Sequence, residues 1–99
     1  MDIQKCYLDQ LKNLVLENTK KQPVQIWLFG SHAKGTTHRY SDIDIAILPI
    51  GQLPAGWISQ LKEIIEQSTI PYFVDIIDLS KTDEDFRNKV FSEGILWKD

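Results

Sequence analysis

The sequence has a single cysteine, Cys6, so it forms neither an internal disulfide nor a zinc site built from cysteines. It also lacks an excess of positive charge, because its formal net charge at pH 7 is -3. A surplus of Lys and Arg supplies most of the affinity of nucleic-acid-binding domains, so we expect no direct binding of nucleic acid.

Long apolar runs are absent as well. Stretches such as Ile45 to Leu48 fall far short of the ~20 residues that span a membrane, and no basic-then-apolar leader opens the chain. We therefore expect a cytoplasmic protein without a membrane segment.

Internal repeats and low-complexity tracts are missing too, and the length of 99 residues with 42% hydrophobic content suits one globular domain over residues 1–99. A core of this size is modest. We therefore expect any large substrate site to be shallow or shared with a partner.

Three short runs have the composition of β-strands. Residues 24–29 are β-branched and aromatic between Pro23 and Gly30, residues 42–48 alternate with a period of two, and residues 72–79 form a third apolar run. The link between the first two is too short for a crossover helix, which favours antiparallel pairing. Residues 30–41 are expected to hold a short helical turn and a loop.

Helical spacing predicts three helices. The first runs from Ile3 to about Thr19 with Asp2 as its cap, the second covers residues 58–65, and the third follows Thr82 and is closed by Gly94. Residues 95–97 are expected to form an apolar tail that docks on the body. Because strands alternate with helices, we predict an α/β (α+β) fold with a small mixed sheet of three or more strands and flanking helices.

The second strand carries two carboxylates, Asp42 and Asp44. Residues two apart on a strand point to the same face, with Cα atoms ~6.5–7 Å apart. Taken alone, the pair is explained more simply as a solvated strand face. Aspartate is depleted in strands, however, and two repelling anions at a strand start favour a site for a divalent cation such as Mg²⁺.

A third carboxylate is expected from the strand at residues 72–79. Asp75 lies within this apolar run, where a carboxylate needs a partner. Asp78 is the alternative, although three positions along a strand reverse the face.

Gly30 and Ser31 follow the first strand directly. Glycine permits a sharp turn and lets backbone amides approach a phosphate, and Ser31 adds a hydroxyl and an amide. A Gly-Ser pair alone is most simply an ordinary turn. Combined with Asp42 and Asp44, it places a phosphate-holding turn beside a metal site.

The pattern Gly30-Ser31, ten residues, then Asp42-Ile43-Asp44 resembles the signature of the polymerase-β-type nucleotidyltransferases. Over nearly its whole length the chain resembles their minimal nucleotidyltransferase (MNT) family, many of which act as antitoxins beside HEPN-domain toxins. His32 and Lys34 stand where that family often has arginine.

The resemblance implies that Asp42 and Asp44 bind two Mg²⁺ ions and that Asp75 binds one of them. Gly30 and Ser31 would then hold the β- and γ-phosphates of ATP. Of two such Mg²⁺ ions, one lowers the pKa of the attacking hydroxyl and the other stabilises the triphosphate. Weaker candidates for neutralising the triphosphate are Lys34 and Arg39.

The resemblance further implies transfer of AMP from ATP to a protein hydroxyl, foremost a tyrosine of a cognate HEPN RNase toxin. Larger members of the superfamily carry an added helical domain, which 99 residues do not supply, so we expect a second polypeptide. The alternative is a weakly catalytic or non-catalytic antitoxin that neutralises its partner by contact. Transfer to a small molecule is disfavoured, because 99 residues are not expected to supply a separate substrate-binding domain. Assembly into a homo-oligomer is a further alternative.

Overall fold

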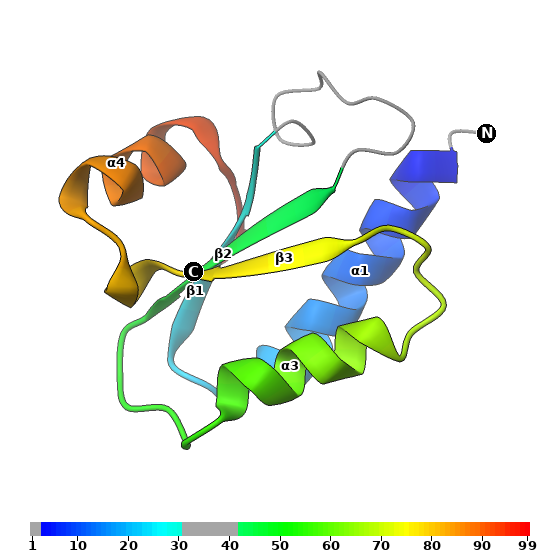
Figure 1. The fold of residues 1–99 in the computed structure, drawn as a ribbon, viewed down its shortest axis with the longest axis horizontal. Coiled ribbons are helices and arrows are strands. Elements are labelled where there is room, and N and C mark those ends of the chain that lie inside the picture. Colours follow the sequence, from blue (N-terminus) through cyan, green and yellow to red (C-terminus); the bar gives the residue numbers. More distant parts are fainter. Residues whose placement is uncertain (1–2, 31–41) are drawn as a thin grey trace.

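A four-stranded sheet forms the centre of the computed structural model, which describes residues 3–30 and 42–99 (Figure 1). The sheet has the order β3-β2-β1-β4. Its strands are β1 (Val24–Phe29), β2 (Ile43–Pro49), β3 (Val74–Asp78) and β4 (Ile95–Lys98). Antiparallel pairing joins β1 to β2 and β4, and parallel pairing joins β2 to β3. The predicted mixed sheet and its antiparallel first pair are confirmed.

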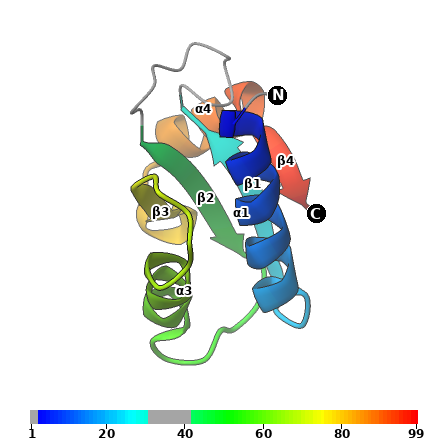
Figure 2. The same ribbon diagram turned by 90° about the vertical axis from the view of Figure 1, so that its right-hand side faces the viewer.

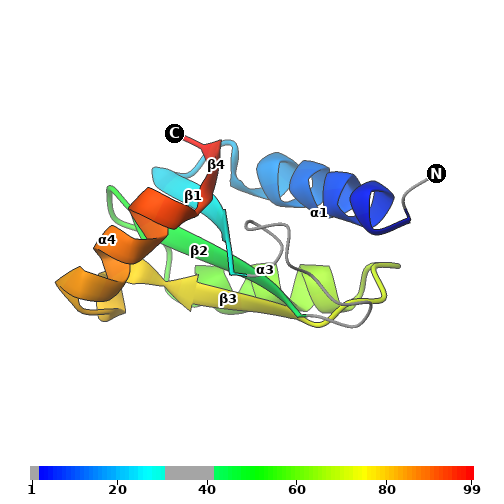
Figure 3. The ribbon, with the colours of Figure 1, turned by 90° about the horizontal axis from the view of Figure 1, so that it is seen from above.

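Helices lie on both faces of this sheet. They are α1 (Ile3–Thr19), α3 (Trp57–Glu66) and α4 (Glu84–Glu93), and a 3-10 turn, η1 (Leu79–Lys81), joins β3 to α4. In Figure 2 α1 lies in front of the sheet, α3 below it and α4 behind it, and Figure 3 shows α4 apart from the other two. The first predicted helix matches α1 in its bounds.

Strand alternation sends side chains into two separate cores. Ile26, Leu28 and Ile45 are buried against α1 and α3, whereas Trp27 and Ala46 are buried on the opposite face against α4 and η1. Each fully buried aliphatic side chain contributes about 1.5–3 kcal/mol of transfer free energy. The two cores fix which way every residue of β1 and β2 points.

Side-chain caps define the segment between β3 and α4. The Asp78 carboxylate accepts hydrogen bonds from the Ser80 amide at 3.0 Å and the Ser80 hydroxyl at 2.6 Å, which starts η1. Asp83 then caps α4 by accepting from the Phe86 amide at 2.7 Å. At the other end, the Gly94 amide donates to the Val90 carbonyl at 2.7 Å, so the predicted closure at Gly94 is confirmed.

Residues 95–97 dock on the body as predicted, by pairing with β1, but their structure as the strand β4 was not predicted. Four residues are too few to show a period of two, but the free edge of β1 offers backbone hydrogen bonds that they satisfy. The third strand is also shorter than predicted, since Leu79 enters η1. The Asp2 cap and the helical turn predicted after Gly30 lie outside the described residues.

No helix in residues 3–30 or 42–99 combines the length and the apolar character that crossing a bilayer requires.

Candidate active site

Asp44 and Asp75 are direct partners across the parallel pair of β2 and β3. Two residues further along each strand, Ala46 and Ile77 belong to the core on the α4 side of the sheet. Residues two apart share a face, so Asp44 and Asp75 lie on this same face, one on each strand. Register thus brings together two acids that are 31 positions apart in the sequence.

Asp42 lies immediately before β2 and is exposed. The Ile43 amide donates to the Phe73 carbonyl at 2.9 Å, which continues the contact between the two chain segments beyond the start of β3. Alternation from Asp44 assigns Asp42 to the acid-bearing face. Strand geometry therefore places all three predicted acids at one end of β2 and β3.

Asp78, the alternative third acid, does not join this group. It pairs in register with Ile47 near the other end of β2, and its carboxylate is engaged by Ser80. The register thus separates Asp78 from Asp44 and leaves Asp75 as the neighbouring acid.

Gly30 closes β1 beside Asp44. Its φ of +81° lies in the left-handed region, and an added Cβ would stand 2.5 Å from Asp44 Oδ2. Phe29, the preceding residue, is the register partner of Asp44 on β2. The sharp turn predicted at Gly30 is present and brings the backbone against an acid of the site. Ser31, Lys34 and Arg39 lie outside the described residues.

The donor set at this end of the sheet consists of carboxylates, which suit a hard cation such as Mg²⁺. Asp44 is half-buried, whereas Asp42 and Asp75 are exposed. Among the residues that the structure describes, no three His, Cys, Asp or Glu side chains are grouped so that they could hold a metal ion. Metal binding by Asp42, Asp44 and Asp75 therefore stays a prediction, and it requires rotation of their side chains toward one another.

In the sequence, Phe73 is recognisable only as part of an apolar strand. In the structure this side chain is 67% exposed, two residues before Asp75. Counting back by two from Asp75 would have assigned it to the face of the acids. Phe73 is thus an aromatic residue beside the site, and its place within an apolar run did not reveal this in the sequence.

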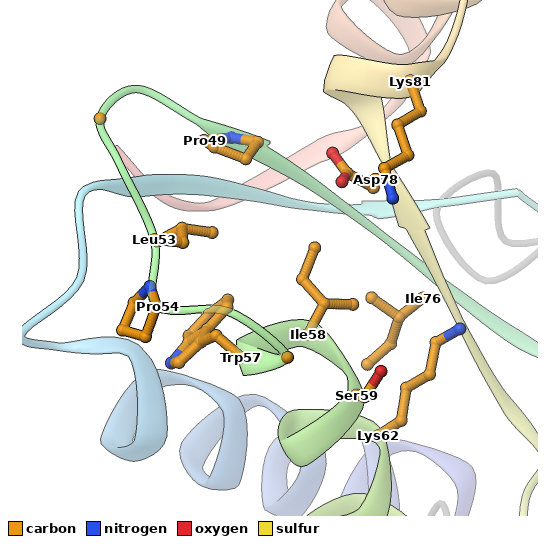
Figure 4. Close-up of a pocket in the computed structure, with 12 residues that line it drawn as sticks. Pro49, Leu53, Pro54, Trp57, Ile58, Ser59, Lys62, Ile76, Asp78 and Lys81 are labelled. Carbon is orange, nitrogen blue, oxygen red and sulfur yellow. The ribbon is translucent and has the colours of Figure 1, made fainter.

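A hollow of about 610 Å³ lies at the other end of the sheet, away from the acids. Pro49 and Asp78, the last residues of β2 and β3, line it together with Trp57 and Lys62 of α3 (Figure 4). The candidate active site is therefore an open sheet end rather than this hollow.

The family model described as polymerase beta, nucleotidyltransferase matches residues 9–98. The chain belongs to this nucleotidyltransferase family. Its fold and the spacing of Gly30, Asp42 and Asp44 agree with the resemblance drawn from the sequence.

Two curated relatives are protein adenylyltransferases in name. The chain is 42% identical over 64 residues to the probable protein adenylyltransferase MntA of Haemophilus influenzae, covering 63% of this chain and 54% of that protein. It is 34% identical over 88 residues to the protein adenylyltransferase MntA of Shewanella oneidensis, covering 87% of this chain and 60% of the relative.

A solved structure also resembles the chain closely in fold. It is the crystal structure of a toxin–antitoxin with AMP-PNP, and it matches with a TM-score of 0.69 and 29% identity over 87% of this chain and 71% of that chain. The chain spans between half and two thirds of the length of the two curated relatives. The 99-residue length therefore does not show whether a further domain belongs to the protein.

Proposed function

We propose that this chain is a Mg²⁺-dependent nucleotidyltransferase that transfers AMP from ATP to a hydroxyl group of a partner protein. The observation that carries the proposal is the register of Asp44 with Asp75, with the Gly30 backbone against the Asp44 carboxylate. The two curated relatives named as protein adenylyltransferases support the same reaction.

In this reaction the acceptor oxygen attacks the α-phosphorus of ATP. A new bond forms between that oxygen and phosphorus, the bond to the bridging oxygen of the β-phosphate breaks, pyrophosphate leaves with the electron pair, and the hydroxyl proton passes to solvent. Asp42, Asp44 and Asp75 would supply the negative oxygens that hold Mg²⁺. Two bound Mg²⁺ ions would activate the hydroxyl and neutralise charge on the entering and leaving oxygens.

The residues around Gly30 orient the triphosphate. The left-handed turn at Gly30 leaves no side chain between the backbone and Asp44, so phosphate oxygens gain close access. Ser31 is proposed to add its amide and hydroxyl, with Lys34 and Arg39 as further cations. This positions the α-phosphorus next to the carboxylates before attack.

The proposed partner is a HEPN-domain RNase toxin with an acceptor tyrosine, and this chain acts as its antitoxin in the cytoplasm. The similar toxin–antitoxin crystal structure with AMP-PNP supports a role in such a pair. The net charge of -3 suits a basic partner.

The test is incubation of the protein with α-labelled ATP, Mg²⁺ and a HEPN-domain protein with which it forms a complex. Transfer of label, with a mass increment on the partner equal to whole AMP units, is the expected result. The Asp42→Asn variant should transfer none. A complex that forms without any label transfer would refute the enzymatic reading and leave neutralisation by contact as the function.

A further inference from the structure

Phe73 is an exposed aromatic ring whose sequence neighbours are packed. Its side chain is 67% exposed, while Tyr72 and Val74 on either side pack against the core under α1 and α3. Single exposed apolar residues are common on protein surfaces, so the exposure alone indicates nothing. The functional argument for Phe73 depends on its position relative to the acids.

The backbone holds Phe73 in a defined place beside the acids. Its carbonyl accepts the Ile43 amide at 2.9 Å, which fixes the residue next to the start of β2. Phe73 precedes Asp75 by two positions, and Tyr72 and Val74 point to the opposite face. Its ring therefore belongs to the face that carries Asp42, Asp44 and Asp75.

The order of strands gives this face a direction. Gly30 directly follows β1, Asp44 lies on the neighbouring β2, and Asp75 lies on β3, an edge strand of the described sheet. In the proposed function, the leaving pyrophosphate lies toward Gly30. An in-line displacement puts the entering oxygen on the opposite side of the phosphorus. The acceptor therefore approaches over β3, where Phe73 stands.

We infer that Phe73 is a positioning residue for the acceptor, stacking against the aromatic ring of the incoming tyrosine. The inference rests on the proposed function, because the direction of approach follows from the transfer chemistry. Aromatic rings prefer offset or edge-to-face contact at centroid separations of about 4.5–7 Å. The adenine base branches from the α-phosphate through the ribose, off the line that joins the entering and leaving oxygens, so the ring is assigned to the acceptor.

Three variants at this position separate a ring contact from a general apolar contact. Phe73→Tyr keeps the ring, Phe73→Leu keeps only apolar bulk, and Phe73→Ala removes both. The matched control is Ile50→Ala, because Ile50 is a 61% exposed apolar residue that follows β2 at the far end. Thermal melts check that each variant folds.

The readout is steady-state transfer of label from ATP, with KM determined separately for the HEPN protein and for ATP. We expect Phe73→Ala to raise the KM for the partner about 2- to 10-fold, in line with one lost aromatic pair, while the KM for ATP stays unchanged. Phe73→Tyr and Ile50→Ala should match the unmutated protein, with Phe73→Leu in between. Unchanged partner KM in Phe73→Ala, or a rise confined to the KM for ATP, would overturn the inference.

A second measurement separates this inference from the proposed function. Benzoylphenylalanine placed at position 73 should crosslink under light to the partner, on the peptide that contains the acceptor tyrosine. A crosslink in a complex that transfers no AMP would refute the transferase proposal and uphold the contact. Transfer without any crosslink, together with an unchanged partner KM in Phe73→Ala, would refute the contact alone.

Discussion

Gly30 and Asp44 are in backbone-to-carboxylate contact, so close that a methyl group at position 30 would overlap Asp44 Oδ2 at 2.5 Å. The contact joins the turn after β1 to β2, the strand that carries Asp44. The turn therefore favours glycine for two reasons. Its φ is +81°, and the position that a Cβ would take is occupied by the Asp44 carboxylate.

Gly30→Ala should therefore destabilise the protein by more than the left-handed strain of about 1–2 kcal/mol, because the Asp44 carboxylate must also rotate away from the added Cβ. Gly56→Ala is the matched control. Gly56 has a similar φ of +74°, but nothing lies within 4 Å of an added Cβ, so this variant should lose only the strain. Urea denaturation of both variants measures the difference.

A double mutant isolates the contact with Asp44. In an Asp44→Ala background, Gly30→Ala should cost about as much as Gly56→Ala, because the overlapping oxygen is gone. An equal cost of Gly30→Ala in both backgrounds would show that Asp44 does not contribute to the requirement for glycine.

Asp42→Asn and Asp75→Asn should abolish AMP transfer while leaving the metal-free protein at least as stable as before. Both carboxylates are exposed and share a sheet face with another acid, so their neutralisation breaks no buried contact and changes the unfolding free energy by no more than about 0.5 kcal/mol. Melting curves in EDTA measure the stability of the metal-free variants, and the transfer assay measures their activity. A clear loss of metal-free stability would indicate a structural role for the acids instead.

Added Mg²⁺ with ATP should raise the melting temperature of the unmutated protein. A ligand that binds only the folded state stabilises it by about 2.7 kcal/mol at 100 times its Kd. The shift should disappear in Asp42→Asn, which keeps the fold but loses a ligand. Equal shifts in the two proteins would show that Asp42 does not take part in binding.

The sequence predicted those parts of the fold that depend on local patterns. Periodicity over a few residues is enough to predict the helix at Ile3–Thr19 and the strand at residues 24–29. The same periodicity assigns Asp42 and Asp44 to one face. The register of Asp44 with Asp75 does not, because parallel pairing of distant segments is decided by how both strands bury their other face. For the same reason β4 and the exposure of Phe73 escaped prediction: edge pairing and solvent access are properties of the assembled sheet.

The cap of α4 offers the sharpest test of local structure. Asp83→Ala should destabilise the protein by about 1 kcal/mol, because the Phe86 amide loses the acceptor that now lies at 2.7 Å. Asp85→Ala is the control, since Asp85 lies exposed in the first turn of the same helix and is expected to act mainly through the helix dipole, for a few tenths of a kcal/mol.

Salt separates the two effects further. Screening should erase most of the small loss in Asp85→Ala at 1 M NaCl, where the Debye length falls to about 3 Å, whereas the loss in Asp83→Ala should persist because a hydrogen bond is broken. Neither variant should change the KM for ATP, because each acts on the first turn of α4, while the contact of α4 with the acid end of the sheet, the Phe86 ring on Phe29 at a centroid distance of 5.6 Å, remains. A raised KM in Asp83→Ala would show instead that the seating of α4 controls the site.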